Sequence, residues 1–200
     1  MTAEAASATS RGQEGTRARL LATALRLFSE HGVEGTSLQM IADALGVTKA
    51  AVYYHFKTKD EITEAVAEPG LRELDQIVTE AAAMRRPGAR IDHLLAGFVD
   101  VVVRYRSLVA LVSRDPGVMR ALTRSWSGRE NFSVRMTEIL TGPDGGVSRA
   151  VAVHAAIAGI ALTGGAHDFA GIEDDKLRES LLEVGRKLLG RPRKVRSGAA

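Results

Sequence analysis

The stretch TSLQMIADALGVTKAAVYYHFKTK, residues 36–59, decides the fold of this chain. Its first half carries apolar residues at helical spacing, Leu38, Ile41, Ala42 and Leu45. This spacing predicts a short helix with one buried face. Gly46 ends that helix, because glycine readily adopts the left-handed conformation common at helix C-termini. We predict a second helix from Lys49 to about Phe56, with Thr48 as its N-cap.

Thr36 or Ser37 can cap the first of these helices, and with Thr36 as the cap Gln39 falls at the capping-box position. Two short helices joined by a tight turn form a helix-turn-helix. The second helix of this motif is suited in size to the major groove of DNA. The sequence therefore points to nucleic acid through the placement of side chains. The net charge of the whole chain, +3, is mild and does not indicate nucleic acid by itself.

A preceding helix is predicted from a cap at Thr16 to about Glu30, ended by Gly32. Its apolar stripe consists of Leu20, Leu21, Ala24, Leu27 and Phe28. Three helices in so short a stretch need a common core, for which we expect Phe28, Ile41, Leu45, Val52 and Phe56. Residues 1–15 are small and polar, and we expect a flexible arm there.

A second capping box, Thr58 to Glu61, begins a further helix that Pro69-Gly70 should kink or interrupt. The remaining apolar segments also have helical spacing, and none shows the alternation of a strand. The predicted fold is therefore all-α, with about nine helices. The tail from 191 to 200 is basic, and we expect it to be flexible.

Several classes of protein are disfavoured by the composition. The 200 residues include no cysteine, and no motif for a catalytic nucleophile, a phosphate loop or a metal site is present. We expect no enzyme, no cofactor and no metal. Residues 147–166 approach the length of a membrane span, but Arg149 and His154 interrupt them, so we expect a buried or subunit-interface helix and no membrane. The first residues lack the apolar core of a signal peptide, which favours the cytoplasm.

Nine residues are candidates for DNA contact: Gln39, Thr48, Lys49, Ala50, Ala51, Tyr53, Tyr54, His55 and Lys59. Lys49 can donate to guanine and Gln39 can pair with adenine, whereas the two alanines allow close approach to a thymine methyl group. The tyrosines and the histidine can donate to phosphate, and Lys59 adds charge at a helix N-terminus. Plainer roles remain open: Tyr53 as a core residue, His55 as a packing residue and Lys49 as an ordinary surface lysine.

From Thr16 to about Val66 the sequence resembles the tetracycline-repressor-type (TetR) family of transcriptional regulators. The resemblance is carried by Thr16-Arg17, Leu27-Phe28, Gly32, Gly35-Thr36-Ser37, Ile41-Ala42, Leu45-Gly46-Val47, Val52-Tyr53-Tyr54-His55-Phe56 and Lys59. Two positions depart from the family pattern. Ala51 stands where the family often has serine or threonine, and Lys57 replaces a frequent proline.

The resemblance implies a homodimer with a helix-turn-helix DNA-binding domain over 16–60 and a ligand-binding and dimerisation domain over 61–190. The last two long helices, about 147–166 and 174–189, would pair across a two-fold axis into a four-helix bundle. Such a dimer would bind a palindromic operator on double-stranded DNA, with its recognition helices about 34–36 Å apart. In the cell it would be cytoplasmic and associated with the nucleoid.

The leading hypothesis for function is a repressor that a small-molecule effector releases from DNA. The candidate pocket residues are His93, Phe98, Val102, Tyr105, Trp126, Phe132, Met136 and His154. Ordinary core packing is the alternative role for each of them. Activation in place of repression, or a scaffold protein that no longer binds DNA, are the alternative functions.

Overall fold

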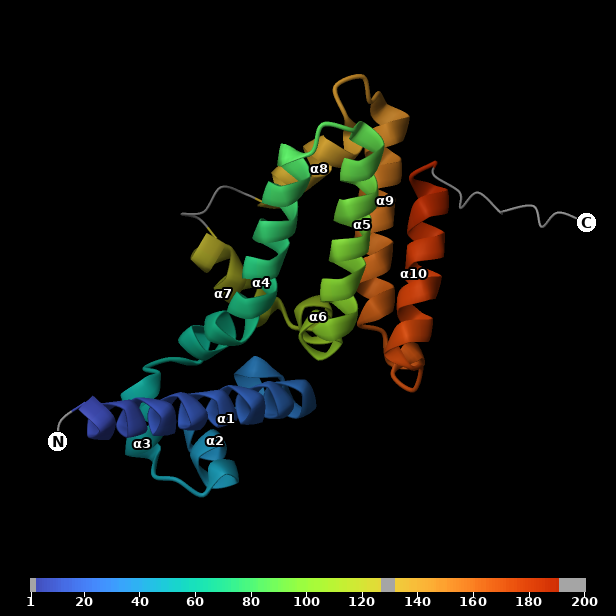
Figure 1. The fold of residues 1–200 in the computed structure, drawn as a ribbon. Helices are drawn as coiled ribbons and strands as arrows, with labels where there is room; N and C mark the ends of the chain where they lie inside the picture. The colour runs from blue at the N-terminus through green and yellow to red at the C-terminus, as the bar shows by residue number, and fades with distance from the viewer. Residues whose placement is uncertain (1–2, 127–131, 191–200) are drawn as a thin grey trace, which may run out of the picture. The chain divides into compact units, whose positions relative to one another are not determined.

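The computed structural model describes residues 3–126 and 132–190, and within these ranges it contains only helices and connecting turns (Figure 1). The all-α prediction is confirmed. The helices are α1 (Ala3–Gly35), α2 (Leu38–Leu45), α3 (Lys49–His55), α4 (Lys59–Ala83), α5 (Pro87–Arg104), α6 (Arg106–Arg114), α7 (Pro116–Trp126), α8 (Phe132–Thr141), α9 (Val147–Gly164), the short 3-10 helix η1 (His167–Phe169) and α10 (Asp174–Leu188).

The described chain divides into two compact units. Unit 1 comprises residues 3–69 and 111–126, and unit 2 comprises residues 70–110 and 132–190. The division differs from the expected boundary at residue 60 in two ways. It falls between Pro69 and Gly70, inside a continuous α4, and it assigns α7 to unit 1. Pro69 therefore lies where the units divide, but it does not end the helix.

Helix α1 differs from its prediction at its N-terminal end. It begins at Ala3, so a helix occupies residues 3–15, where we expected a flexible arm. The segment is rich in alanine, the strongest helix former, and contains no proline. Near its C-terminal end the helical conformation breaks at Gly32, as expected, with φ 73° and ψ 165°. This left-handed φ is readily available to glycine alone.

The core of unit 1 contains most of the side chains expected there. Phe28, Ile41, Val52 and Phe56 are buried, whereas Leu45 is only partly covered. Gly46 ends α2 in the left-handed conformation with φ 68°, and its N–H bonds back to the carbonyls of the last turn. The predicted turn between the two short helices is confirmed.

In unit 2, α5 packs against α8, α9 and α10 (Figure 1). The buried face of α5 includes Leu94, Leu95, Phe98, Val99 and Val102. Glycines let neighbouring helices approach closely. A Cβ atom at Gly185 of α10 would lie 2.6 Å from Leu95 Cδ1, and one at Gly165 would lie 2.7 Å from the backbone nitrogen of Ala110.

Replacement of Gly165 by alanine is expected to destabilise unit 2 by about 1–3 kcal/mol, because the new methyl group meets rigid backbone and cannot be relieved by a rotamer change. Gly171→Ala is the control, since no atom lies within 4 Å of its Cβ position, and it should change the stability by less than about 0.5 kcal/mol. Urea unfolding followed by circular dichroism compares the two. Equal stability of both variants would refute the close packing at Gly165.

Helix α9 is mostly apolar and exposes several large apolar side chains. By length and apolarity it is the one helix in the described ranges that could cross a membrane. That is weak evidence for a membrane, because a helix at a subunit interface has the same composition. Its side chains Val147, Val151 and Leu162 are exposed in this single chain.

Candidate nucleic-acid interface

The start of α2 is fixed by Ser37. Its hydroxyl oxygen accepts a hydrogen bond from the N–H of Met40 at 3.1 Å, so Ser37 is the N-cap and Thr36 is not. Thr36 is 2% exposed, and its hydroxyl donates to the carbonyl of Gly32 at 2.8 Å. Gln39 consequently takes no part in a capping box. Its amide donates to the Asp43 carboxylate at 2.7 Å on the exposed surface of α2.

Helix α3 is anchored by one face and exposed on the other. The Thr48 hydroxyl accepts from the N–H of Ala51 at 3.2 Å, which confirms the predicted cap. Val52 is fully buried and holds the helix on the unit 1 core. On the opposite face, Tyr53 is 40% exposed and Tyr54 is 69% exposed. Tyr53 is therefore not a core residue, and both hydroxyl-bearing rings are available to a ligand.

The exposed face of α3 carries positive charge next to aromatic rings. The Lys49 ammonium lies 5.6 Å from the centre of the Tyr53 ring. The His55 ring makes an edge contact with Tyr54, with ring centres 5.2 Å apart. Lys49, Ala50 and the two tyrosines are exposed, whereas Ala51 and His55 are half-buried.

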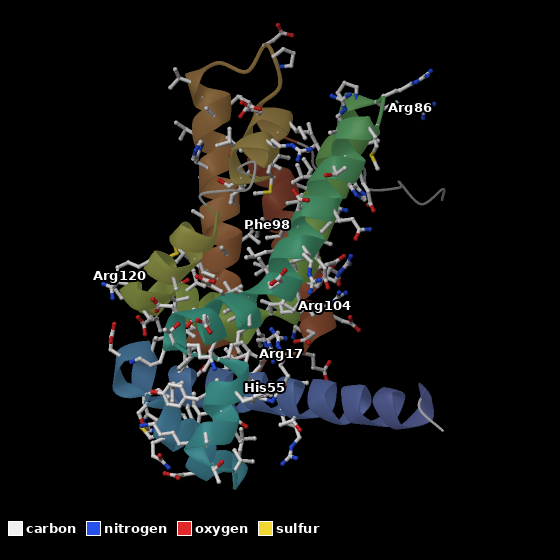
Figure 2. All side chains as sticks on the ribbon, turned by 90° about the vertical axis from the view of Figure 1, so that its left-hand side faces the viewer. Arg17, His55, Arg86, Phe98, Arg104 and Arg120 are labelled. Carbon is white, nitrogen blue, oxygen red and sulfur yellow. The ribbon has the colours of Figure 1, made fainter. Side chains whose placement is uncertain are left out.

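Arg17 is a further cation beside α3, and the nine candidates do not include it. Its guanidinium lies 5.1 Å from the centre of the Phe56 ring, and the residue is exposed (Figure 2). The distance is within the range of a cation–π interaction. This contact places an arginine of α1 beside the end of α3, although 39 positions separate it from Phe56 in the sequence. In the sequence, Arg17 is one of three arginines, with Arg11 and Arg19, that could reach phosphate or simply be solvated.

Lys59 is bonded to the turn that follows the break at Gly32. Its ammonium donates to the carbonyl oxygens of Val33 at 2.7 Å and Glu34 at 3.2 Å, and lies 3.6 Å from the Glu34 carboxylate. The side chain is partly exposed and lines the groove described below. Lys59 thus supports this turn, and its expected contact with DNA stays a prediction.

The start of α4 has the Thr58 half of the predicted capping box, whereas the Glu61 carboxylate bonds one residue before the cap. The Thr58 hydroxyl accepts from the N–H of Glu61 at 3.1 Å, and the Glu61 carboxylate accepts from the N–H of Lys57 at 2.7 Å. The ammonium of Lys57 donates to the carbonyl of Tyr53 near the C-terminal end of α3. Lys57 is exposed and adds a second cation to this end of the helix.

A groove of about 370 Å³ brings the two expected base-reading side chains together. Gln39 of α2 and Lys49 of α3 both line it, as does Tyr53. The remaining wall comes from the turn between α1 and α2 and from Lys59. Donors of two kinds, an amide and an ammonium, therefore share one concave surface on unit 1.

The six candidate ligand residues whose side chains the structure describes lie in different surroundings. Phe98, Val102 and Met136 belong to the closely packed core of unit 2, and Phe98 points into the helical bundle (Figure 2). His154 is exposed on α9, and its Nδ1 lies 2.9 Å from the Ala150 carbonyl. The side chains of Trp126 and Phe132 lie outside the described part of the chain.

The other two ligand candidates lie close to carboxylates. The Tyr105 hydroxyl donates to Glu73 at 2.9 Å. Burial, and then this hydrogen bond, raise the pKa of Tyr105, which keeps the hydroxyl a neutral donor. His93 Nε2 lies 3.1 Å from the Glu80 carboxylate, in an open groove of about 490 Å³ between α4 and α5. The periodicity predicted the burial of Phe98, Val102 and Met136 correctly but could not distinguish core from pocket.

Comparison with known sequences relates unit 1 to a known family. The family model described as bacterial regulatory proteins, tetR family, matches residues 20–66, which cover the C-terminal half of α1, the helix-turn-helix and the start of α4. The part of the chain that contains the helix-turn-helix is therefore similar to the TetR family. This family consists of transcriptional regulators and not of enzymes.

Several TetR-family proteins resemble longer parts of this chain. The probable acrEF/envCD operon repressor of Escherichia coli K12 is 33% identical over 102 residues, which are 48% of this chain and 46% of the relative. The chain thus spans about half the length of this curated relative. The crystal structure of a TetR/AcrR regulator from Thermobifida fusca is 27% identical and has a TM-score of 0.56, covering 90% of this chain and all of that one.

A third relative supports the TetR fold alone, because its sequence is only 18% identical. The structure of AibR in complex with isovaleryl coenzyme A and operator DNA has a TM-score of 0.62. It covers 84% of this chain and 96% of its own.

Proposed function

We propose that the chain is a sequence-specific DNA-binding transcriptional regulator that works in the cytoplasm on chromosomal DNA. The observation that carries this proposal is the exposed face of α3, where Lys49, Tyr53 and Tyr54 stand free on a helix anchored by buried Val52. A helix of seven residues is about 11 Å long, and the DNA major groove is about 12 Å wide. The similarity to the TetR family supports the same reading of unit 1.

The candidate residues divide into two roles. Lys49 and Gln39, which share one groove, are positioned to read base edges, with Thr48, Ala50 and Ala51 allowing close approach. Tyr53, Tyr54 and His55 would donate to phosphates, helped by the cations of Arg17 and Lys57. Lys59 would add charge beside this group while it supports the turn after Gly32.

The test of this proposal is a gel-shift assay with the DNA upstream of the chain's own reading frame, followed by selection from random duplexes if that DNA is not bound. A regulator retards a specific duplex, and the affinity falls as salt rises because phosphate contacts release counterions. A scaffold protein that has lost DNA binding would retard none of the duplexes. A reporter gene behind the bound sequence then separates repression from activation.

Tyr53→Phe is expected to weaken operator binding by about 2- to 10-fold, which corresponds to one hydrogen bond to phosphate. The ring, and its contact with Lys49, are retained in this variant. Fluorescence anisotropy on the selected duplex measures the loss, and nonspecific DNA should show a similar decrease because phosphate contacts carry no sequence information. Unchanged affinity would remove Tyr53 from the interface.

We further propose that the regulator is a homodimer formed through α9 and α10. These helices pack on each other, and their outer face exposes Val147, Val151, Leu162, Val184 and Leu188. A contiguous apolar face of this kind is unusual on a monomer and is buried when a second copy covers it. A two-fold axis would pair the same face of both copies and would favour a palindromic operator with half-sites about 34–36 Å apart.

Release from DNA by a small-molecule effector is the third part of the proposal. Helices α4 and α6 each begin in one unit and end in the other, so both can carry a change from unit 2 to unit 1. AibR, a structural neighbour, has been solved with both isovaleryl coenzyme A and operator DNA. An effector must bind the DNA-binding state and the released state with different affinity in order to shift the balance between them. Screening of metabolite pools for release of labelled operator tests this part.

A further inference from the structure

We propose that Asp115 is a positioning residue for DNA recognition, because it fastens α7 to the turn that leads into the helix-turn-helix. The inference rests on the proposed function. It adds to the DNA-binding unit a part of the chain that is distant in sequence from residues 16–60. All of the groups involved belong to unit 1.

Each oxygen of the Asp115 carboxylate accepts one backbone hydrogen bond. Oδ1 accepts from the N–H of Gly117 at 2.8 Å and so caps the start of α7. Oδ2 accepts from the N–H of Val33 at 2.7 Å, across 82 positions of sequence. Val33 is buried and directly follows the break at Gly32. One side chain thus holds the start of one helix and the turn after another.

Glycines make room for the carboxylate on both sides. A Cβ atom at Gly117 would lie 2.9 Å from Oδ1, and one at Gly32 would lie 3.3 Å from Oδ2. The left-handed φ of Gly32 already disfavours a side chain there. Because Gly32 and Gly117 have no side chains, the carboxylate can approach the backbone closely on both sides.

Charged side chains surround the same turn. The Glu34 carboxylate lies 3.2 Å from Arg120 of α7 and 3.6 Å from Lys59 at the start of α4. Lys59 also donates to the carbonyl of Val33. The two residues after the Gly32 break are thus held by α7 on one side and by α4 on the other.

The position of this turn controls the orientation of the recognition helix. Thr36, three residues after Val33, bonds back to Gly32, and α2 begins at Leu38. Helix α3 packs on α2 in turn. Asp115 itself follows the last residue of α6, which begins in unit 2. A displacement of α6 would therefore reach the helix-turn-helix through Asp115, in parallel with the route through α4.

The experiment separates the two bonds of Asp115. Asp115→Ser keeps a good N-cap for α7, since serine caps helices as well as aspartate does, but its shorter side chain cannot reach Val33. Binding is measured by fluorescence anisotropy on a duplex that the wild type binds. We expect affinity to fall about 5- to 50-fold, within the range for an unsatisfied buried N–H. The helix content and oligomeric state should be unchanged. Asp168→Asn, an exposed carboxylate outside unit 1, is the control and should bind as the wild type does.

Hydrogen exchange of the peptide covering residues 33–36 provides a readout that does not depend on DNA. Faster exchange in Asp115→Ser, with the peptides of α7 unchanged, supports the link even if the wild type binds no duplex and the proposed function fails. Wild-type affinity, or wild-type exchange of this peptide, in a folded Asp115→Ser protein would overturn the inference.

Discussion

Replacement of Val151 and Val184 by glutamate should convert the proposed dimer to a monomer and weaken operator binding by about 100-fold or more. Val151 on α9 is 62% exposed and Val184 on α10 is 51% exposed, so neither change disturbs the packing of a single chain. In a symmetric dimer the double variant would bury four carboxylates, each at a cost of about several kcal/mol when unpaired. Light scattering after size exclusion measures the mass, and anisotropy measures the loss of affinity.

Val134→Glu is the matched control for this prediction. Val134 is 48% exposed on α8, outside the proposed interface, and the variant should remain dimeric. Thermal unfolding should show that the monomeric variant keeps its helices. A double variant that stays dimeric and binds DNA normally would exclude α9 and α10 as the subunit interface.

Lys49→Ala should abolish most of the preference for the operator over random DNA. The side chain is exposed at the start of α3, where a bidentate contact to guanine is worth about 1–3 kcal/mol in each half-site. The two half-sites of a dimer would together lose about 2–6 kcal/mol, or about 30- to 25,000-fold in specific affinity, if their losses add. Competition between operator and scrambled duplexes in the anisotropy assay gives the specificity ratio.

Arg85→Ala removes an equal charge from the loop between α4 and α5, in unit 2. This variant should leave the ratio of specific to nonspecific affinity unchanged, which separates base reading from general attraction to phosphate. If Lys49→Ala and Arg85→Ala lowered specific and nonspecific binding alike, Lys49 would be a phosphate contact or a bystander. Gln39 would then be the remaining candidate for reading bases.

The parts of the fold that depend on local chemistry were predictable from the sequence. The left-handed end of α2 at Gly46 and the cap at Thr48 follow from the preferences of single residues, and both are present. The helix over residues 3–15 was missed, because we gave more weight to small polar composition than to alanine content.

Contacts between distant segments were not predictable. The spacing of Lys59 gave no sign that its ammonium would turn back onto the carbonyl of Val33. Asp115-Pro116 indicates the start of a helix, but nothing in the sequence signals the bond from Asp115 to Val33, 82 positions away. Phe98 and Met136 show the same limit in unit 2, where helical periodicity locates buried side chains but does not show whether they enclose a ligand or each other.

The hydrogen bond between Val33 and Asp115 bears on how such regulators can be recombined. A chimaera that grafts residues 3–69 onto another regulator's body would leave the Val33 N–H without its acceptor and Glu34 without Arg120. The DNA-binding unit that such a graft must transfer is therefore discontinuous in the sequence. It includes residues 111–126, and a crossover placed at the end of the helix-turn-helix would divide it.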